Sequence, residues 1–279
     1  MIQHFILTRF NLRLWNRDKS GSSVRTREWL EHRFSLFERY CLPSIIGQTC
    51  HDFTWIVLFD SQTPDEYKSR VGGYLKLCPQ LVPIYVSPQE GRYFAQIFGD
   101  EVRKRVVASA RVLSTYLDND DALSVHFVED IQRRTEKLRD GTFITYNDGY
   151  QYFMDYHYVM RIHYPRNHFV SVVEKNDLSQ VRTIYGFGSH YYLVKIPGVK
   201  IEQVSGARMW CEVIHEKNMG NDAYFLHAAM EKDGALLQRE FSIDVPTEHG
   251  LFLYLFRFLP RYAMTFIRRV RNRLFGRKW

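Results

Sequence analysis

The chain contains little cysteine: Cys41, Cys50, Cys78 and Cys211 are the only four among 279 residues. They are widely spaced, no two form a C-x-x-C pair, and no histidines accompany them at the spacing of zinc ligands. This pattern excludes a disulfide scaffold and a cysteine-based zinc site, and it indicates buried thiols in a reducing compartment.

Long uncharged hydrophobic runs are also missing. No stretch reaches the roughly 18 apolar residues that a membrane-spanning helix needs. The N-terminus, MIQHFILTRFNL, has neither a basic leading segment nor a small-residue cleavage site. We therefore expect a cytoplasmic protein, and its 45% of hydrophobic residues is enough to bury one sizeable core.

Acidic residues are absent from the last part of the chain. Residues 251–279 hold eight Lys or Arg and no Asp or Glu, which leaves 30 basic and 31 acidic side chains in the first 250 residues. The net charge of +7 therefore belongs to the tail. A nucleic-acid groove spreads its Lys and Arg over the folded surface, so this distribution argues against nucleic acid as a partner.

The tail, residues 246–279, mixes apolar side chains with arginine at helical spacing. Phe266, Val270 and Leu274 fall on one stripe of a helix. Largely off that stripe lie Arg268, Arg269, Arg271 and Arg273. A basic amphipathic helix of this kind can lie in the headgroup layer of an anionic membrane, so we expect peripheral binding at the inner membrane. The alternative is a C-terminal helix that packs on the domain with a solvated basic edge.

The first half of the chain alternates strand and helix patterns. Helical periodicity at 25–46, 95–109 and 121–138 separates apolar runs that are typical of strands covered on both faces. The apolar runs are 4–10, 53–60, 81–86 and 111–117. The order β-α-β-α-β-α-β-α predicts a parallel sheet, and strand-rich segments follow from about residue 142. We expect one mixed α/β domain over residues 1–245.

The segment YLDNDDALSV places Asp118, Asn119, Asp120 and Asp121 directly behind one of these strands. In open α/β sheets, ligands bind outside the carboxyl ends of the strands. Asp118 and Asp120 alternate with Asn119, so in extended backbone their side chains leave on the same side. Crowded carboxylates repel one another unless a cation lies among them, and oxygen ligands select Mg²⁺ or Mn²⁺.

Acids in such a segment can also belong to a calcium loop or to a helix cap. A calcium loop starting at Asp118 would have Asp120 and Glu129 at ligand positions, but Ala122 and Leu123 occupy the fifth position and the glycine position, which excludes it. In a helix cap, Asp121 would cap the following helix and the remaining acids would be solvated. Capping needs one acid, whereas three are present.

Several segments, taken in order, resemble the GT-A fold glycosyltransferases and, among them, a family of bacterial rhamnosyltransferases. The segments are HFILTRFNL, LPSIIGQTCHDFTWIVLFDSQTPDE, LDNDDAL, HFVSVVEK, TIYGFGSHYY and MWCEVIHEKN, and the resemblance spans about residues 3–225. It implies a GT-A-like (Rossmann-like) α/β fold with a mixed, mostly parallel sheet flanked by helices. It also implies transfer of a sugar, such as L-rhamnose from dTDP-rhamnose, to a glycan or lipid-linked glycan acceptor in cell-surface polysaccharide synthesis, with inversion.

The resemblance further implies which residues bind the nucleotide-sugar donor. Thr8, Arg9 and Asn11, at the end of the first strand, would line the nucleotide pocket together with Asp60 at the end of the second. Asp118 would contact the ribose or the metal.

The metal site implied by the resemblance uses the acidic segment. Asp118, Asp120 and Asp121 would hold a divalent ion, Mn²⁺ or Mg²⁺, against the diphosphate, and His215 in VIHEKN would complete the site. The alternative for His215 is an ordinary hydrogen-bonded residue at a strand end.

Inverting transfer also needs a carboxylate base near the acceptor hydroxyl. Glu174, after the apolar FVSVV, is the first choice, with Asp148 in YNDGY and Asp222 in GND behind it. A surface ion pair with Lys175 is the alternative for Glu174.

Two other functions share features of this sequence. A sugar-1-phosphate nucleotidyltransferase would have an α/β core and metal-binding acids, but it would need a glycine-rich loop after the first strand, and TRFNLRLWNRDKSGSS has a single glycine. A non-catalytic peripheral membrane protein would bind anionic lipid through the tail alone.

Overall fold

The computed structural model describes residues 1–14, 26–108, 110–175, 177, 181–215 and 228–247, and nine positions between 255 and 271. Most of the tail expected at 246–279 lies outside the described residues. Among the helices that are described, none is long and apolar enough to cross a membrane.

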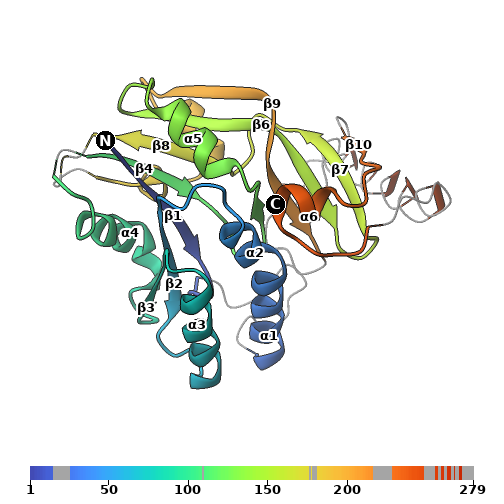
Figure 1. Cartoon of the computed structure of the whole chain (residues 1–279), viewed down its shortest axis with the longest axis horizontal. Coiled ribbons are helices and arrows are strands. Elements are labelled where there is room, and N and C mark those ends of the chain that lie inside the picture. The colour runs from blue at the N-terminus through green and yellow to red at the C-terminus, as the bar shows by residue number, and fades with distance from the viewer. Residues whose placement is uncertain are drawn as a thin grey trace.

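One ten-stranded sheet organises the described chain (Figure 1). Its first half consists of β1 (Ile2–Arg9), β2 (Thr54–Asp60), β3 (Leu81–Val86) and β4 (Arg111–Tyr116), which pair in parallel in the order β3-β2-β1-β4. β1, β2 and β4 are buried along most of their length, as expected for apolar strands covered on both faces. The predicted parallel half of the sheet is confirmed.

Helices connect these parallel strands. β1 leads to α1 (Arg27–Leu36), the π-helical turn η1 (Phe37–Cys41) and α2 (Leu42–Ile46), β2 to α3 (Asp65–Leu77), and β3 to the short η2 (Gly91–Tyr93) and α4 (Phe94–Arg103). The Thr26 side chain caps α1 by accepting a hydrogen bond from the Trp29 N–H at 3.1 Å. Pro43 lies in the first turn of α2, directly after the π-helical turn, and has no N–H to donate to the preceding turn. The helix predicted at 25–46 therefore forms as three successive helical segments.

The second half of the sheet is built by strands of both directions. β8 (Val170–Glu174) lies antiparallel between β4 and β6 (Thr142–Phe153), and β7 (Tyr158–His163) and β10 (Ala228–Met230) extend the sheet. β9 (Lys200–Ile214) runs parallel to β6 and antiparallel to β5 (Ala122–Leu123). Because only β5, β7 and β8 oppose the direction of β1, the sheet is mixed but mostly parallel, as expected. The remaining helical segments are α5 (Phe127–Thr135), η3 (Ile184–Phe187), η4 (His190–Lys195) and α6 (Leu236–Phe241).

Two apolar layers cover β1 because successive side chains of a strand point to opposite faces. Ile6 lies in the layer that also contains Phe34 of α1 and Trp55 of β2, together with side chains of α3 and α5. Phe5 and Leu7 lie in the other layer, which contains side chains of α4 and η3. A continuous apolar run is therefore required in β1.

The carboxyl ends of three strands meet at one edge of the sheet. β1 ends at Arg9, β2 at Asp60 and β4 at Tyr116, and the three strands are parallel neighbours. β5 follows the acidic segment directly and pairs with β9 at Trp210 and Cys211. The fold therefore brings the end of β9 to the same edge.

Candidate functional site

The acidic segment forms a turn that is fastened to β1. Leu117 N–H still pairs with the Leu7 carbonyl at 3.1 Å, and the Asn119 side chain donates to the Phe10 carbonyl at 3.1 Å. Asp118 accepts a hydrogen bond from the Tyr116 hydroxyl at 2.7 Å. These bonds place all three aspartates of the turn 118–121 at the carboxyl edge of the sheet.

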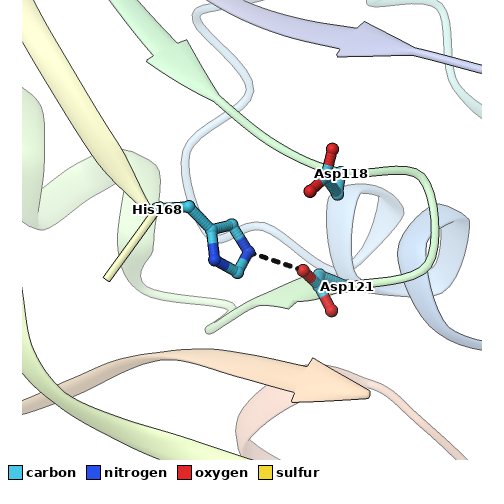
Figure 2. A group of neighbouring side chains, drawn as sticks. All are labelled: Asp118, Asp121 and His168. Atoms are coloured by element: carbon cyan, nitrogen blue, oxygen red, sulfur yellow. Dashed lines mark hydrogen bonds and ion pairs between the residues drawn. The ribbon is translucent and has the colours of Figure 1, made fainter. Parts of the chain in front are cut away.

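Asp118, Asp121 and His168 come together in one cluster (Figure 2). One ligand atom from each residue lies within 4.8 Å of the others, and His168 Nε2 lies 2.7 Å from Asp121 Oδ2. The other oxygen of Asp121 accepts the Val213 N–H at 2.9 Å, which fixes the carboxylate from β9. Two carboxylates and an imidazole at this spacing form a donor set that suits a divalent ion such as Mn²⁺.

Burial governs the protonation of Asp121 and His168. Burial raises the pKa of the Asp121 carboxyl to about 8, and the negative charges of Asp120 and Glu212 add to it, although the hydrogen bond from His168 opposes them. Burial works against a charge on the His168 ring, but the hydrogen bond to Asp121 outweighs it and raises the His168 pKa to about 9. Both groups therefore keep their protons at neutral pH, and a metal ion would have to displace them.

Asp120 has different partners from its two neighbours. Its Oδ2 accepts hydrogen bonds from Arg33 Nη1 at 3.0 Å and from His215 Nε2 at 3.0 Å. Burial alone would raise the Asp120 pKa, but the charge of Arg33 and the contact with His215 outweigh it and hold the pKa below its usual range. The His215 side chain is fully buried and its ring lies edge-on to that of His32, with 5.3 Å between centroids. The structure thus brings His215 to the acidic turn, but beside Asp120 rather than in the cluster with Asp121.

Asn11 and Asp60, two of the residues expected in the nucleotide pocket, lie together at the carboxyl edge. Asn11 accepts the Asp60 N–H at 3.0 Å and donates to the Thr63 hydroxyl at 2.9 Å. Asp60 accepts from Arg13 Nε at 2.5 Å. Thr8 is different, because its hydroxyl is fully buried and accepts a hydrogen bond from Trp55 Nε1 at 2.9 Å. The Thr8 side chain therefore points into the core between β1 and β2.

Arg9 lies in an aromatic enclosure. Its guanidinium carbon is 4.7 Å from the ring centroid of Phe94, 5.0 Å from that of Tyr185 and 5.9 Å from that of Tyr116. Arg9 Nη2 donates to the Tyr116 hydroxyl at 3.1 Å, and that hydroxyl in turn donates to Asp118. Burial opposes its charge, but Tyr116, Tyr185 and Asp118 outweigh burial and raise the pKa of Arg9 above its ordinary value. Arg9 is therefore linked to Asp118 of the acidic turn through the Tyr116 hydroxyl.

Glu174 does not lie at this edge. In the antiparallel pair of β4 and β8 it stands opposite Val112, six residues before Asp118, and at about 3.3 Å per residue this places it roughly 20 Å from the acidic turn. Its two carboxylate oxygens accept the N–H groups of Arg182 and Thr183 at 3.0 and 2.9 Å. Burial raises its pKa. The carboxylate expected to act as the base therefore fastens the chain after β8, away from the acidic turn.

Asp148, the second candidate for the base, lies on β6. It accepts the Gly206 N–H at 2.7 Å and lies 2.9 Å from Nδ1 of His163. Both of its carboxylate oxygens therefore already have partners. Asp222, the third candidate, lies outside the described residues.

Three residues of the site were not predicted from the sequence: His168, Glu212 and Arg33. His168 opens the segment HFVSVV and Glu212 lies within MWCEVIHEKN, so both stand in segments that carry the family resemblance. Glu212 is buried, accepts a hydrogen bond from Gln151, and has a raised pKa because of burial, with the negative charges of Asp118 and Asp120 adding to the effect. An acid inside an otherwise apolar strand is the signal that could have found Glu212. Arg33 had no such signal.

Solved structures with a similar chain path include the Staphylococcus aureus protein TarS. The sequence identity is 9%, the match covers 76% of this chain and 36% of that one, and the TM-score is 0.39. For TarS 1-349 in complex with UDP the values are 10% identity, 76% of this chain, 60% of that chain and a TM-score of 0.42. For 4-diphosphocytidyl-2C-methyl-D-erythritol synthase the sequence identity is 10%, the match covers 74% of this chain and 90% of that one, and the TM-score is 0.30. This chain thus spans less than two thirds of the TarS chains it matches.

No curated protein matches this sequence. The protein family described as "Putative rhamnosyl transferase" matches residues 15–225. That range includes the acidic turn, His168, Glu212 and His215, and it covers most of the chain. The chain accordingly belongs to this rhamnosyl transferase family.

Proposed function

We propose that this glycosyltransferase moves L-rhamnose from dTDP-rhamnose to a glycan or lipid-linked glycan acceptor in cell-surface polysaccharide synthesis. The family match supports the reaction class and the sugar. The observation that carries the proposal is the cluster of Asp118, Asp121 and His168 at the carboxyl edge of the sheet, where ligands of open α/β sheets bind.

A divalent ion fits this cluster on grounds of charge and ligand type. Asp118 and Asp121 supply two negative charges, and His168 can supply a neutral nitrogen once its proton has left. When bound there, Mn²⁺ or Mg²⁺ would neutralise charge on the departing nucleoside diphosphate. The chain's own part is to hold these ligands in place, through Tyr116 on Asp118 and the Val213 N–H on Asp121.

The donor's nucleoside would lie beside the end of β2. Asn11 and Asp60 are joined there by a hydrogen bond from backbone to side chain, so each limits the movement of the other. Arg13 now occupies one oxygen of Asp60. We propose that the nucleoside binds next to this group, with Arg9 acting behind it through Tyr116 and Asp118.

An inverting course is proposed from the family resemblance, and it requires a carboxylate base on the acceptor side. Glu174 is remote from the acidic turn, and Asp148 is held by His163 and Gly206. Neither side chain therefore offers a carboxylate to an acceptor at the acidic turn.

The tail would hold the enzyme at the cytoplasmic face of the membrane. Three of its described side chains, Phe256, Met264 and Ile267, are 66%, 65% and 63% exposed. Val270, on the stripe expected from the sequence, is 40% exposed. Exposed apolar side chains among eight basic ones are the features by which an amphipathic segment binds anionic lipid.

A thermal-shift experiment on the full chain tests the donor site. The protein is heated with dTDP, UDP or dTDP-rhamnose, with and without Mn²⁺, and a ligand at a hundredfold excess over Kd stabilises the folded state by about 2.7 kcal/mol. We expect a metal-dependent rise of Tm with dTDP, and release of dTDP from dTDP-rhamnose on longer incubation. No rise with any nucleotide would reject the donor site and favour a protein that merely binds lipid.

A further inference from the structure

Glu212 is a buried acid outside the cluster of Asp118, Asp121 and His168. It lies on β9, and only 6% of its surface is exposed. Its Oε2 accepts a hydrogen bond from Nε2 of Gln151, the residue directly opposite on β6. Within the part of the chain that the structure describes, the carboxylate forms no ion pair, and its Oε1 accepts no hydrogen bond but is not sealed from solvent.

An acid in this setting lowers the stability of the fold. Gln151 is fully buried, and so are Cys211 and Val213 on either side of Glu212. A buried carboxylate that forms no ion pair is costly, because a single amide replaces little of the water that the carboxylate has lost. Two apolar side chains at positions 151 and 212 would pack at a lower cost. The pair of Gln151 and Glu212 therefore indicates a task in the site rather than in packing.

Glu212 lies beside the acidic turn. The residue before it in β9 pairs with β5, which follows the turn directly. The N–H of the residue after it, Val213, donates to Asp121 Oδ1 at 2.9 Å. The charge of Glu212 contributes to the raised pKa of His168. The Glu212 carboxylate is therefore near the cluster of Asp118, Asp121 and His168 without belonging to it.

We propose that Glu212 binds hydroxyl groups of the sugar to be transferred and that Gln151 holds its carboxylate in position. In a nucleotide sugar, the sugar is attached to the second phosphate, so it lies next to the diphosphate expected at the acidic turn. Sugar hydroxyls donate hydrogen bonds, and a carboxylate oxygen accepts them more strongly than a neutral group does. A few fixed polar groups of this kind determine which ligand a pocket selects. This inference rests on the proposed function and adds a residue that determines the choice of donor sugar.

Titration calorimetry of the full chain with dTDP and with dTDP-rhamnose, both in the presence of Mn²⁺, tests this assignment. Both ligands carry the nucleoside diphosphate, so the ratio of their Kd values isolates the contribution of the sugar. Glu212→Gln keeps the shape of the side chain and removes its charge. It should weaken binding of dTDP-rhamnose about tenfold relative to dTDP, because a hydrogen bond to a charged group contributes more than one to a neutral group.

The choice of sugar supplies a second measurement. Glu212→Gln should also reduce the difference in Kd between dTDP-rhamnose and dTDP-glucose, which a purely structural role would leave unchanged. Glu202→Gln is the matched control, since it is the same substitution at an exposed position of β9. It should leave the Kd values of all three ligands as they are in the unchanged protein.

Two results would overturn the inference. One is an unchanged ratio of the two Kd values in Glu212→Gln. The other is an equal loss for dTDP and dTDP-rhamnose, because Glu212 would then support the acidic turn instead of contacting the sugar. If Glu212→Gln does not fold, Gln151→Met decides: it removes the donor that holds Glu212 but keeps the charge, and it should change the ratio in the same direction. Failure of the unchanged protein to bind dTDP would instead reject the donor site of the proposed function, and this inference with it.

Discussion

His168 Nε2 lies 2.7 Å from Asp121 Oδ2, although the two residues are 47 positions apart and belong to different connections of the sheet. Asp121 follows β4, and His168 precedes β8, the antiparallel neighbour of β4. Because the start of an antiparallel strand lies beside the end of its partner, His168 arrives at the acidic turn as a direct result of that pairing.

Replacing His168 by glutamine should weaken Mn²⁺ binding. The glutamine amide lacks the nitrogen lone pair that imidazole offers to a metal ion. We therefore expect the Mn²⁺ affinity, measured by titration calorimetry, to fall at least about a hundredfold, because even the loss of a residue that only supports a ligand lowers metal affinity by about ten- to a hundredfold. His163→Gln is the matched control. His163 lies on β7 and contacts Asp148 of β6, so it has no part in the acidic turn. Unchanged Mn²⁺ affinity in His168→Gln would mean that the ion has other ligands.

Metal binding should strengthen as pH rises. His168 has a pKa raised to about 9 and Asp121 a pKa raised to about 8, so their protons compete with the ion at neutral pH. Binding releases these protons, and the Kd for Mn²⁺ should fall by about tenfold per pH unit for each proton released between about pH 6 and pH 8. Calorimetry in two buffers of different ionisation enthalpy would count the released protons. An affinity that does not change with pH would show that no proton is displaced.

Gly149→Ala should destabilise the protein strongly. A Cβ at this position would lie 2.1 Å from the ring of Trp210, which is held by a hydrogen bond to the Tyr146 carbonyl and stacks on Phe169. We expect a loss of about 3 kcal/mol or more in the free energy of unfolding, measured by urea denaturation, since the clash is with a rigid buried ring.

The matched control for Gly149→Ala is Gly72→Ala. Gly72 lies inside α3 with nothing within 4 Å of the added Cβ. Its replacement by alanine should raise the free energy of unfolding by about 1 kcal/mol, because alanine favours the helix. Equal effects of the two substitutions would contradict the close packing described at Gly149.

Deleting residues 251–279 should abolish binding to anionic vesicles. The segment holds eight basic and no acidic residues, and each basic residue near an anionic surface contributes about 1 kcal/mol. Cosedimentation with phosphatidylglycerol vesicles should lose the full chain's binding, and higher salt should weaken binding of the full chain. Equal cosedimentation of the two proteins would place the lipid contact elsewhere or favour a tail packed on the domain.

The pattern of apolar residues was sufficient to predict the parallel half of the sheet. Continuous apolar runs such as 53–60 are typical of strands covered on both faces. The helical segments between these runs indicate crossover connections, which make neighbouring strands parallel. The acidic turn was also predictable, because acids directly after a buried strand lie at the edge where ligands bind.

Local sequence could not predict on which face or at which end of the sheet a side chain would lie. Thr8 sits one residue before Arg9, yet its hydroxyl is buried against Trp55 while Arg9 reaches the acidic turn through Tyr116. Glu174 ends an apolar run just as Asp118 does, but β8 runs antiparallel, so its carboxyl end lies at the opposite edge.

By itself, the sequence determined the strands, the acidic turn and the basic tail, since these depend on residues that are adjacent along the chain. Only the tertiary structure decided the partners of each acid. Arg33, His168 and Glu212 come from α1, the loop before β8 and β9, and the pairing of the strands and the packing of α1 bring them to the turn. Such contacts depend on strand direction and register, which no short stretch of sequence encodes.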